Sequence, residues 1–183
     1  MSITLSSERY EEIKRTVVEL FVKYDVNCVP VNGFEIATKM GIKIHAFSAF
    51  PASTRKLLLM KSEDGFVVEK RENEWFIYYN DDKGYGRINN TLLHEIGHII
   101  LDHTEDSELA DKEVKFFAKY ALVPPVLVHK MKLSTAEEIE ERFNVSAQAA
   151  RYALSYYHKW LNYGEQDYTD YEITLLRQFH DVA

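Results

Sequence analysis

The stretch Thr91–His103, TLLHEIGHIILDH, decides how the rest of this sequence can fold. As an α-helix it places His94 and His98 about 40° apart on one face, one turn above the other, so both imidazoles can reach a single metal ion. Glu95 lies about 60° from His98, where a carboxylate can act as general base on a metal-bound water. The opposite face is apolar and can enter a core. This H-E-x-x-H pattern predicts a single catalytic zinc ion bound by the two histidines, with Glu95 as the catalytic residue.

Two residues that follow the motif have different expected roles. His103 falls about 140° from His98 on the far side of an ideal helix, so we expect a helix-end residue and not a ligand. Asp102 lies one turn beyond His98. It could accept the second imidazole N–H of His98 and so fix the tautomer, or it could be a solvated carboxylate at the helix end.

A catalytic zinc needs a third protein ligand and an open position for water. We expect this ligand on a second helix, over residues 107–122. Asp111 falls inside the apolar arc of that helix, where a carboxylate is costly unless it is paired or binds a metal, whereas Glu113 falls outside the arc. Asp111 is therefore the predicted third ligand. Glu113 is the first alternative, and Glu108 is the least favoured of the three.

The composition limits the class of protein. The chain has 183 residues, of which 46% are hydrophobic, and a net charge of −7. This length supports one compact core, and the charge disfavours non-specific binding of nucleic acid. Cys28 is the single cysteine, so neither an internal disulfide nor a cysteine zinc site can form. The sequence contains neither a signal peptide nor a membrane span, so we expect a cytoplasmic protein without a membrane partner.

The residue patterns predict an α+β fold in which a small antiparallel or mixed sheet packs on helices and a helical C-terminal part follows. Helices are expected over residues 8–24, 34–40, 107–122, 126–131, 135–143 and 147–160, with a last helix within 165–183. Strands are expected over 42–46, 56–60, 65–70 and 75–79. The last two strands form a hairpin. Trp75–Tyr79 is either an edge strand, on which an extended substrate could pair, or an internal strand.

Several motifs together resemble the ImmA/IrrE family of metallopeptidases. They are Arg87–His98, Leu101–His103, and Asp111–Ala118 running into Leu122-Val123-Pro124. The resemblance implies a zincin-like minimal metallopeptidase domain over residues 1–125. A helical region over 126–183 would follow, and it could pack with the first part as one domain.

The resemblance also implies an activity and a ligand set. The family's enzymes are zinc-dependent endopeptidases, often encoded by mobile elements, that cleave a helix-turn-helix transcriptional repressor. The family's third zinc ligand corresponds to Asp111, but this chain has Asp in place of Glu and Val114 in place of Ala. Because Asp is one methylene shorter, the second helix would have to approach more closely, or the site would use Glu113.

Residues 135–160 contain two expected helices joined at Asn144-Val145, which resembles a helix-turn-helix. Gln148 and Arg151 near the start of the second helix could contact DNA. The aromatic residues that follow and the acidic preceding helix favour packing or docking of a partner protein instead.

Two points stay open at the level of sequence. Peptide hydrolysis needs a donor that stabilises the oxyanion, and Tyr78, Tyr85 and His129 are equal candidates.

The competing interpretation is a non-catalytic regulator that binds a partner or DNA and has a vestigial or structural metal site. Glu95 argues against a regulator, because a structural site needs no base, whereas the departure at Asp111 argues for it.

Overall fold

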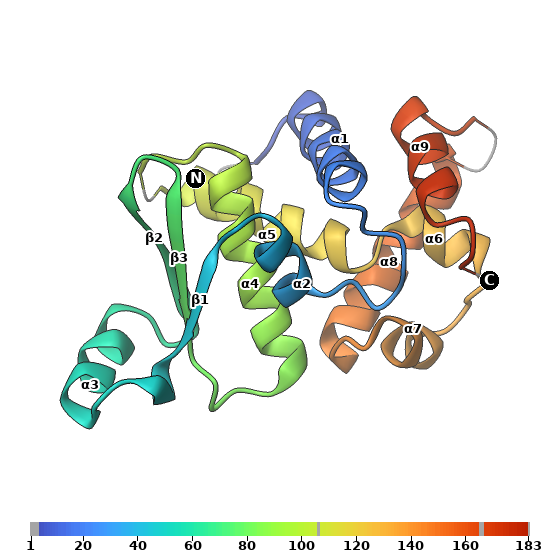
Figure 1. Cartoon of the computed structure of the whole chain (residues 1–183). Coiled ribbons are helices and arrows are strands. Elements are labelled where there is room, and N and C mark those ends of the chain that lie inside the picture. Colours follow the sequence, from blue (N-terminus) through green and yellow to red (C-terminus); the bar gives the residue numbers. More distant parts are fainter. Residues whose placement is uncertain (1–3, 106, 165–166, 183) are drawn as a thin grey trace. The chain divides into compact units, whose positions relative to one another are not determined.

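The computed structural model describes residues 4–105, 107–164 and 167–182. It confirms the α+β class: helices dominate, and they accompany a three-stranded mixed sheet (Figure 1). Contacts divide the chain into two compact units. One combines Met1–Val31 with Lys115–Ala183, and the other is Asn32–Val114. Units of contact need not coincide with domains, so the division at residue 125 stays a prediction.

The sheet of the unit Asn32–Val114 has the strand order β1-β3-β2. Its strands are β1 (Lys43–Ala46), β2 (Gly65–Arg71) and β3 (Glu74–Tyr79). β2 and β3 form the predicted antiparallel hairpin, while β1 pairs in parallel with the other side of β3. Of the two alternatives for Trp75–Tyr79, the structure therefore has the internal strand. β2 is the edge strand on the hairpin side.

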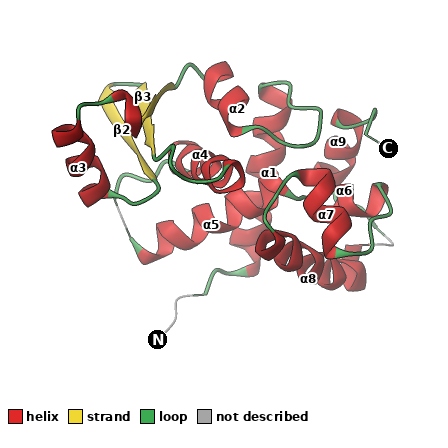
Figure 2. Cartoon of the chain, turned by 90° about the horizontal axis from the view of Figure 1, so that it is seen from below, coloured by secondary structure: helices red, strands yellow, loops and turns green. Residues whose placement is uncertain are grey.

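Residues 56–60, which we predicted to be a strand, lie instead in helix α3 (Ala52–Lys61). The segment consists of leucine, methionine and lysine, which are good helix formers, and it contains no β-branched residue. Leu57 and Met60 are 65% and 75% exposed, so the segment is not a buried strand. Its apolar run alone could not distinguish a short strand from a helix. Figure 2 shows α3 beyond the strands.

Helix α4 (Tyr85–Ile100) packs against β2 and β3 and against α2 (Gly33–Lys39). On its apolar face Leu92, Leu93 and Ile96 are fully buried, as predicted, whereas Ile99 and Ile100 at the end of the helix are half-buried. The approach to β2 is so close that a Cβ atom on Gly65 would lie 2.7 Å from the Thr91 Cγ2 atom. Asn89 Oδ1 accepts a hydrogen bond of 2.7 Å from the Gly33 backbone N–H. These contacts fix α4 beside the sheet.

The described part of the other unit contains no strands (Figure 2). Its helices are α1 (Ser7–Lys23), α6 (Pro125–Lys130), α7 (Ala136–Phe143), α8 (Ala147–Gly164) and α9 (Asp170–Gln178). α1 packs on α9, and both α6 and α7 pack on α8. Ser6 and Thr135 are the N-caps of α1 and α7, and the side chain of each accepts a hydrogen bond from a backbone N–H of the first helical turn. Residues 165, 166 and 183 of the predicted last helix lie outside the described residues.

Helix α5 (Glu108–Leu122) contains the boundary between the two units, which falls after Val114. A single 3-10 turn, η1 (Phe47–Ala49), links β1 to α3. Within the described ranges, no helix combines the length and the apolar character needed to cross a bilayer.

Candidate metallopeptidase site

His94 and His98 lie on successive turns of α4, as the spacing predicts. Their ring centroids are 5.1 Å apart and their ring planes meet at 66°. Both side chains are half-buried. Glu95, between them in the sequence, is 7% exposed. The helix therefore brings two imidazoles and one nearly buried carboxylate to one region of the unit Asn32–Val114.

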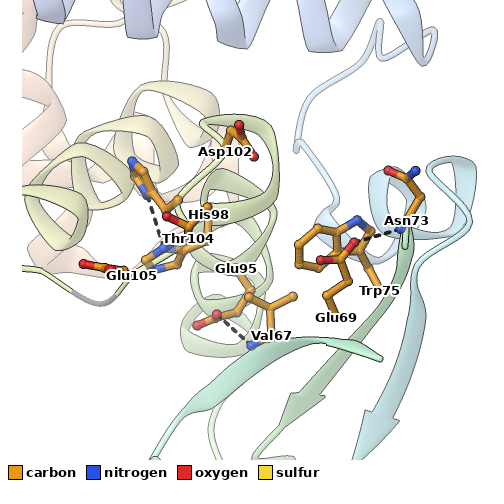
Figure 3. A pocket seen from close by; sticks show the side chains of 10 residues that line it. Val67, Glu69, Asn73, Trp75, Glu95, His98, Asp102, Thr104 and Glu105 are labelled. Carbon is orange, nitrogen blue, oxygen red and sulfur yellow. Dashed lines mark hydrogen bonds between the residues drawn. The ribbon is translucent and has the colours of Figure 1, made fainter. Parts of the chain in front are cut away.

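A cavity of about 490 Å³ opens beside these residues (Figure 3). One wall comes from the hairpin, and the other comes from α4 and the segment that follows it. The lining residues from the hairpin are Val67, Glu69, Asn73 and Trp75. Those from α4 and the following segment are Glu95, His98, Asp102, His103, Thr104 and Glu105. A cavity of this size is typical of a ligand site.

The Glu95 carboxylate is held by the edge strand. The backbone N–H of Val67, in β2, donates a hydrogen bond of 3.0 Å to Glu95 Oε2. Because this donor belongs to a paired strand, it fixes the orientation of the carboxylate at the cavity. No pattern in the sequence connects Val67 with Glu95.

His103 lies close to His98, and the prediction that it points to the far side of the helix was wrong. α4 ends at Ile100, and Asp102 adopts a left-handed conformation with φ 55°. This residue reverses the chain, and the His103 backbone N–H then donates a 3.0 Å hydrogen bond to the His98 carbonyl oxygen. The Nδ1 atoms of His103 and His98 are 3.2 Å apart. Ideal helical geometry no longer applies beyond Ile100.

Asp102 does not form the hydrogen bond to His98 that we considered for it. Within the described part of the chain, no hydrogen bond joins its carboxylate to His98, and the side chain is exposed at the rim of the cavity. Of the two alternatives for Asp102, the structure has the solvated carboxylate. His103 instead provides a contact to the His98 Nδ1 atom.

The acidic residues of α5 differ from the expected arrangement. Glu113 is 5% exposed, and its Oε2 atom lies 2.9 Å from His103 Nε2. Asp111 is half-buried, and Glu108 is exposed and pairs with Lys112 at 3.1 Å. The prediction that Glu113 lies outside the buried arc was wrong. The apolar residues of the arc are buried as expected, but the buried surface of α5 is wider and also includes Phe116 and Tyr120.

The donors around His98 are of the kinds that zinc binds, namely imidazole nitrogens and a carboxylate. His103 connects His98 to Glu113 through two contacts of about hydrogen-bond length. However, no group of three or more His, Cys, Asp or Glu side chains among the described residues is arranged to hold a metal ion. The donor set fits zinc in its chemistry.

None of the three candidate oxyanion donors lines the cavity. Tyr78 in β3 stacks on His45 and Phe66, with ring centroids 5.5 and 5.3 Å apart. Side chains alternate along a strand, so Tyr78 is on the sheet face opposite to Trp75. Tyr85 begins α4 and is 43% exposed. His129 belongs to the other unit, where its Nδ1 atom lies 3.0 Å from the Tyr157 hydroxyl.

The helix-turn-helix-like unit consists of α7 and α8, joined at Asn144, which is left-handed with φ 50°. Gln148 and Arg151 near the start of α8 are exposed. Further along α8, the aromatic side chains pack within their own unit: Lys119 Nζ lies 3.9 Å from the Tyr152 ring centroid, and Trp160 donates a hydrogen bond to Glu172. Contact with DNA by this unit stays a prediction.

An H-E-x-x-H helix packed on a small mixed sheet, with a cavity at its second histidine, is typical of the metallopeptidase class. The chain belongs to the peptidase M78 family, because the family model described as the IrrE N-terminal-like domain matches residues 37–155. This confirms the resemblance to ImmA/IrrE proteins and indicates a metallopeptidase-like function. No curated protein matches the chain significantly.

Proposed function

We propose that this protein is a zinc-dependent endopeptidase in which Glu95 is the general base. The observation that carries the proposal is the position of Glu95. Its carboxylate is 7% exposed, is oriented by the Val67 N–H and lines a cavity of about 490 Å³ together with His98. A structural metal site needs no carboxylate at this position, whereas hydrolysis of a peptide needs a base beside the water that attacks it.

His94 and His98 would hold the zinc ion. We assign Glu113 as the third ligand, because its contact with His103 connects it to His98, and Asp111 is the alternative. When bound, zinc supplies a Lewis acid and lowers the pKa of a water towards about 7.

Glu95 carries the proton transfers in this proposal. Its carboxylate accepts a proton from the water that attacks the peptide carbonyl carbon, and a new C–O bond forms. Glu95 then returns the proton to the amine nitrogen as the C–N bond breaks, so it ends the cycle as a carboxylate. The Val67 N–H keeps Glu95 Oε2 in one orientation throughout.

The proposed substrate is a helix-turn-helix transcriptional repressor encoded beside the protein. The resemblance to the ImmA/IrrE family supports this substrate class. A flexible or locally unfolded segment of such a protein fits best, because a peptide bond must enter the cavity in an extended form to reach Glu95.

The test combines metal analysis with cleavage. Protein purified without added zinc is analysed for metal and then incubated with the neighbouring repressor. Wild type should contain zinc and cleave, and Glu95→Gln should keep the zinc and lose cleavage by at least about 100-fold. Retained cleavage by Glu95→Gln, or failure of the wild type to bind zinc at all, would refute the proposal.

The third ligand is decided by a matched pair of variants. Glu113→Gln should lower zinc stoichiometry and activity together, whereas Asp111→Asn should retain both. The reverse result assigns Asp111 as the ligand and leaves the enzyme function intact. Circular dichroism of both variants shows whether they remain folded.

The second candidate is a non-catalytic regulator that binds a partner protein or DNA. One observation favours it: in the part of the chain described by the structure, no three metal-binding side chains are arranged around a common point. Binding to DNA would use residues 135–160, where Gln148 and Arg151 are exposed. Tight binding to the operator region of the neighbouring repressor, without cleavage at any zinc concentration, would support this candidate.

A further inference from the structure

We propose that the cavity beside Glu95 is a subsite for a lysine or arginine side chain of the peptide substrate, with Glu69 and Trp75 as its specificity-determining residues. The inference rests on the proposed peptidase function, because it assigns the substrate class of the same site. The observations behind it are the cavity itself, the charges of its lining residues and the aromatic ring of Trp75.

The charges on the cavity wall have one sign. Its lining carries the carboxylates of Glu69, Glu95, Asp102 and Glu105, and no described lining residue is a lysine or arginine. Glu69, Asp102 and Glu105 form no ion pair within the described ranges. Glu69 Oε1 accepts a 2.7 Å hydrogen bond from the Asn73 backbone N–H, which orients this carboxylate on the hairpin.

The basic residues of the hairpin are directed away from the cavity. Lys70 lies at the register shift between Glu69 and Arg71, and its side chain contacts Phe76 and Tyr78, which are on the sheet face opposite to Trp75. Its Nζ atom lies 4.0 Å from the Phe76 ring centroid and 5.7 Å from that of Tyr78. Arg71 is 87% exposed and lies 3.9 Å from Glu74. Neither basic residue of the hairpin therefore pairs with the Glu69 carboxylate in the cavity.

Trp75 adds an aromatic surface beside Glu69. The two residues are register partners across the β2–β3 pair, so their side chains project from the same face of the sheet. Figure 3 shows Glu69 and Trp75 together on the hairpin wall, with Glu105 on the opposite wall. An indole face accepts the aliphatic part of a lysine or arginine and attracts its cationic end, while the carboxylates pair with that end. A glutamate or aspartate of the substrate would be repelled.

Binding is measured with Glu95→Gln, so that a bound peptide is not turned over. The probes are short peptides that are uncharged apart from the central residue and differ only there: arginine, lysine, norleucine or glutamate. Trp75 fluorescence reports occupancy, and Trp75→Phe, which retains Trp160 as background, should lose the signal. We expect the arginine and lysine peptides to bind about tenfold more tightly than norleucine, with the advantage shrinking at high salt.

Glu69→Gln in the same background should reduce the advantage of arginine over norleucine at least threefold. Glu72→Gln is the matched control, because it removes one negative charge from the exposed hairpin turn without touching the cavity. Circular dichroism verifies that each variant is folded. Equal affinity for the arginine and norleucine peptides, or an unchanged ratio in Glu69→Gln, would overturn the subsite.

Cleavage of the same peptides by the zinc-loaded wild type separates this inference from the proposed function. Cleavage without preference for a basic residue leaves the peptidase standing and refutes the subsite. Preferential binding of the arginine and lysine peptides without any cleavage supports the subsite and counts against the peptidase.

Discussion

The Nδ1 atom of His103 lies 3.2 Å from the Nδ1 atom of His98, although His103 lies beyond the end of the helix that carries His98. His98 is thus contacted from outside its own helix, by a residue that also contacts the buried Glu113. Contacts of this kind fix the tautomer and the ring orientation of a metal-binding histidine.

Replacing His103 should therefore weaken metal binding. We expect His103→Ala to lower zinc affinity about 10- to 100-fold, because His98 loses the contact that orients its ring. Competition with a chromophoric chelator measures the affinity. Asp102→Asn is the control, because Asp102 is exposed, makes no hydrogen bond to His98 within the described ranges, and Asn tolerates its left-handed conformation. Equal zinc affinity of His103→Ala and wild type would show that His103 has no such role.

Adding one methyl group at Gly65 should destabilise the fold. Its Cβ atom would lie 2.7 Å from both Thr91 Cγ2 and the Tyr78 carbonyl oxygen, so β2 and α4 would have to separate. We expect Gly65→Ala to lower the free energy of unfolding by about 1–3 kcal/mol in a urea titration. Gly84→Ala should cost less, at most about 1 kcal/mol from the weaker N-cap of α4, because a Cβ atom there meets nothing within 4 Å. Similar values for both variants would contradict the close approach.

Two buried tyrosines should respond in opposite ways to loss of the hydroxyl group. The Tyr120 hydroxyl is buried without a hydrogen-bond partner among the described residues, so Tyr120→Phe should leave stability unchanged or raise it by up to about 1 kcal/mol. Tyr171 donates a 2.6 Å hydrogen bond to Glu11, so Tyr171→Phe should cost about 1.5–3 kcal/mol. Thermal and urea unfolding measure both. A large loss in Tyr120→Phe would reveal a partner for its hydroxyl.

Glu11 should make stability depend on pH in the acid range. Burial raises the pKa of Glu11, but hydrogen bonds from Lys14 and Tyr171 outweigh burial, and the pKa is lowered overall. Lys14 Nζ and the Tyr171 hydroxyl each lie 2.6 Å from an oxygen of its carboxylate. Because the folded pKa is below the unfolded value of about 4.3, the stabilisation is complete above that pH and is lost as the pH falls through the folded value.

The measurement is urea unfolding of wild type and Glu11→Gln at several pH values. The variant should be less stable at pH 7, and the difference should shrink towards about pH 3 as Glu11 of the wild type becomes protonated. Glu141→Gln, which removes an exposed carboxylate from α7, serves as the control for a change in net charge. A difference that is constant between pH 7 and pH 3 would disagree with the lowered pKa.

Helices whose apolar residues recur at helical spacing, or whose first residue follows a strong N-cap, were predictable from the sequence. α4 and α5 have apolar residues at helical spacing, and Ser6 and Thr135 are strong N-caps. The strand order was not predictable, because the pairing of β1 with β3 depends on contacts between distant segments. The strand prediction for Lys56–Met60 was wrong because an apolar run is compatible with either a strand or a helix. Only the exposure of its side chains on α3 distinguishes the helix from a buried strand.

The candidate site was predictable only where it lies inside one helix. His94, Glu95 and His98 follow from helical spacing, and the structure places them together on α4. The position of His103 beside His98 could not be predicted, because it depends on where α4 ends and on the left-handed conformation of Asp102. That Val67, Glu69 and Trp75 line the cavity could not be predicted, because it depends on which edge of the sheet lies against α4. The alternation of side chains in the hairpin could indicate only that Glu69 and Trp75 share one face.

The helical unit is built from both ends of the chain. The hydrogen bond from Tyr171 to Glu11 spans 160 positions, and the Phe21 and Phe179 rings lie 5.7 Å apart. During synthesis on the ribosome, α1 cannot pack on α9 until α9 has emerged. Residues 32–114, which contact one another within their own unit, have all been synthesised by then. A premature stop shortly before α9 would thus deprive the earliest helix of its packing partner and leave residues 32–114 complete in sequence.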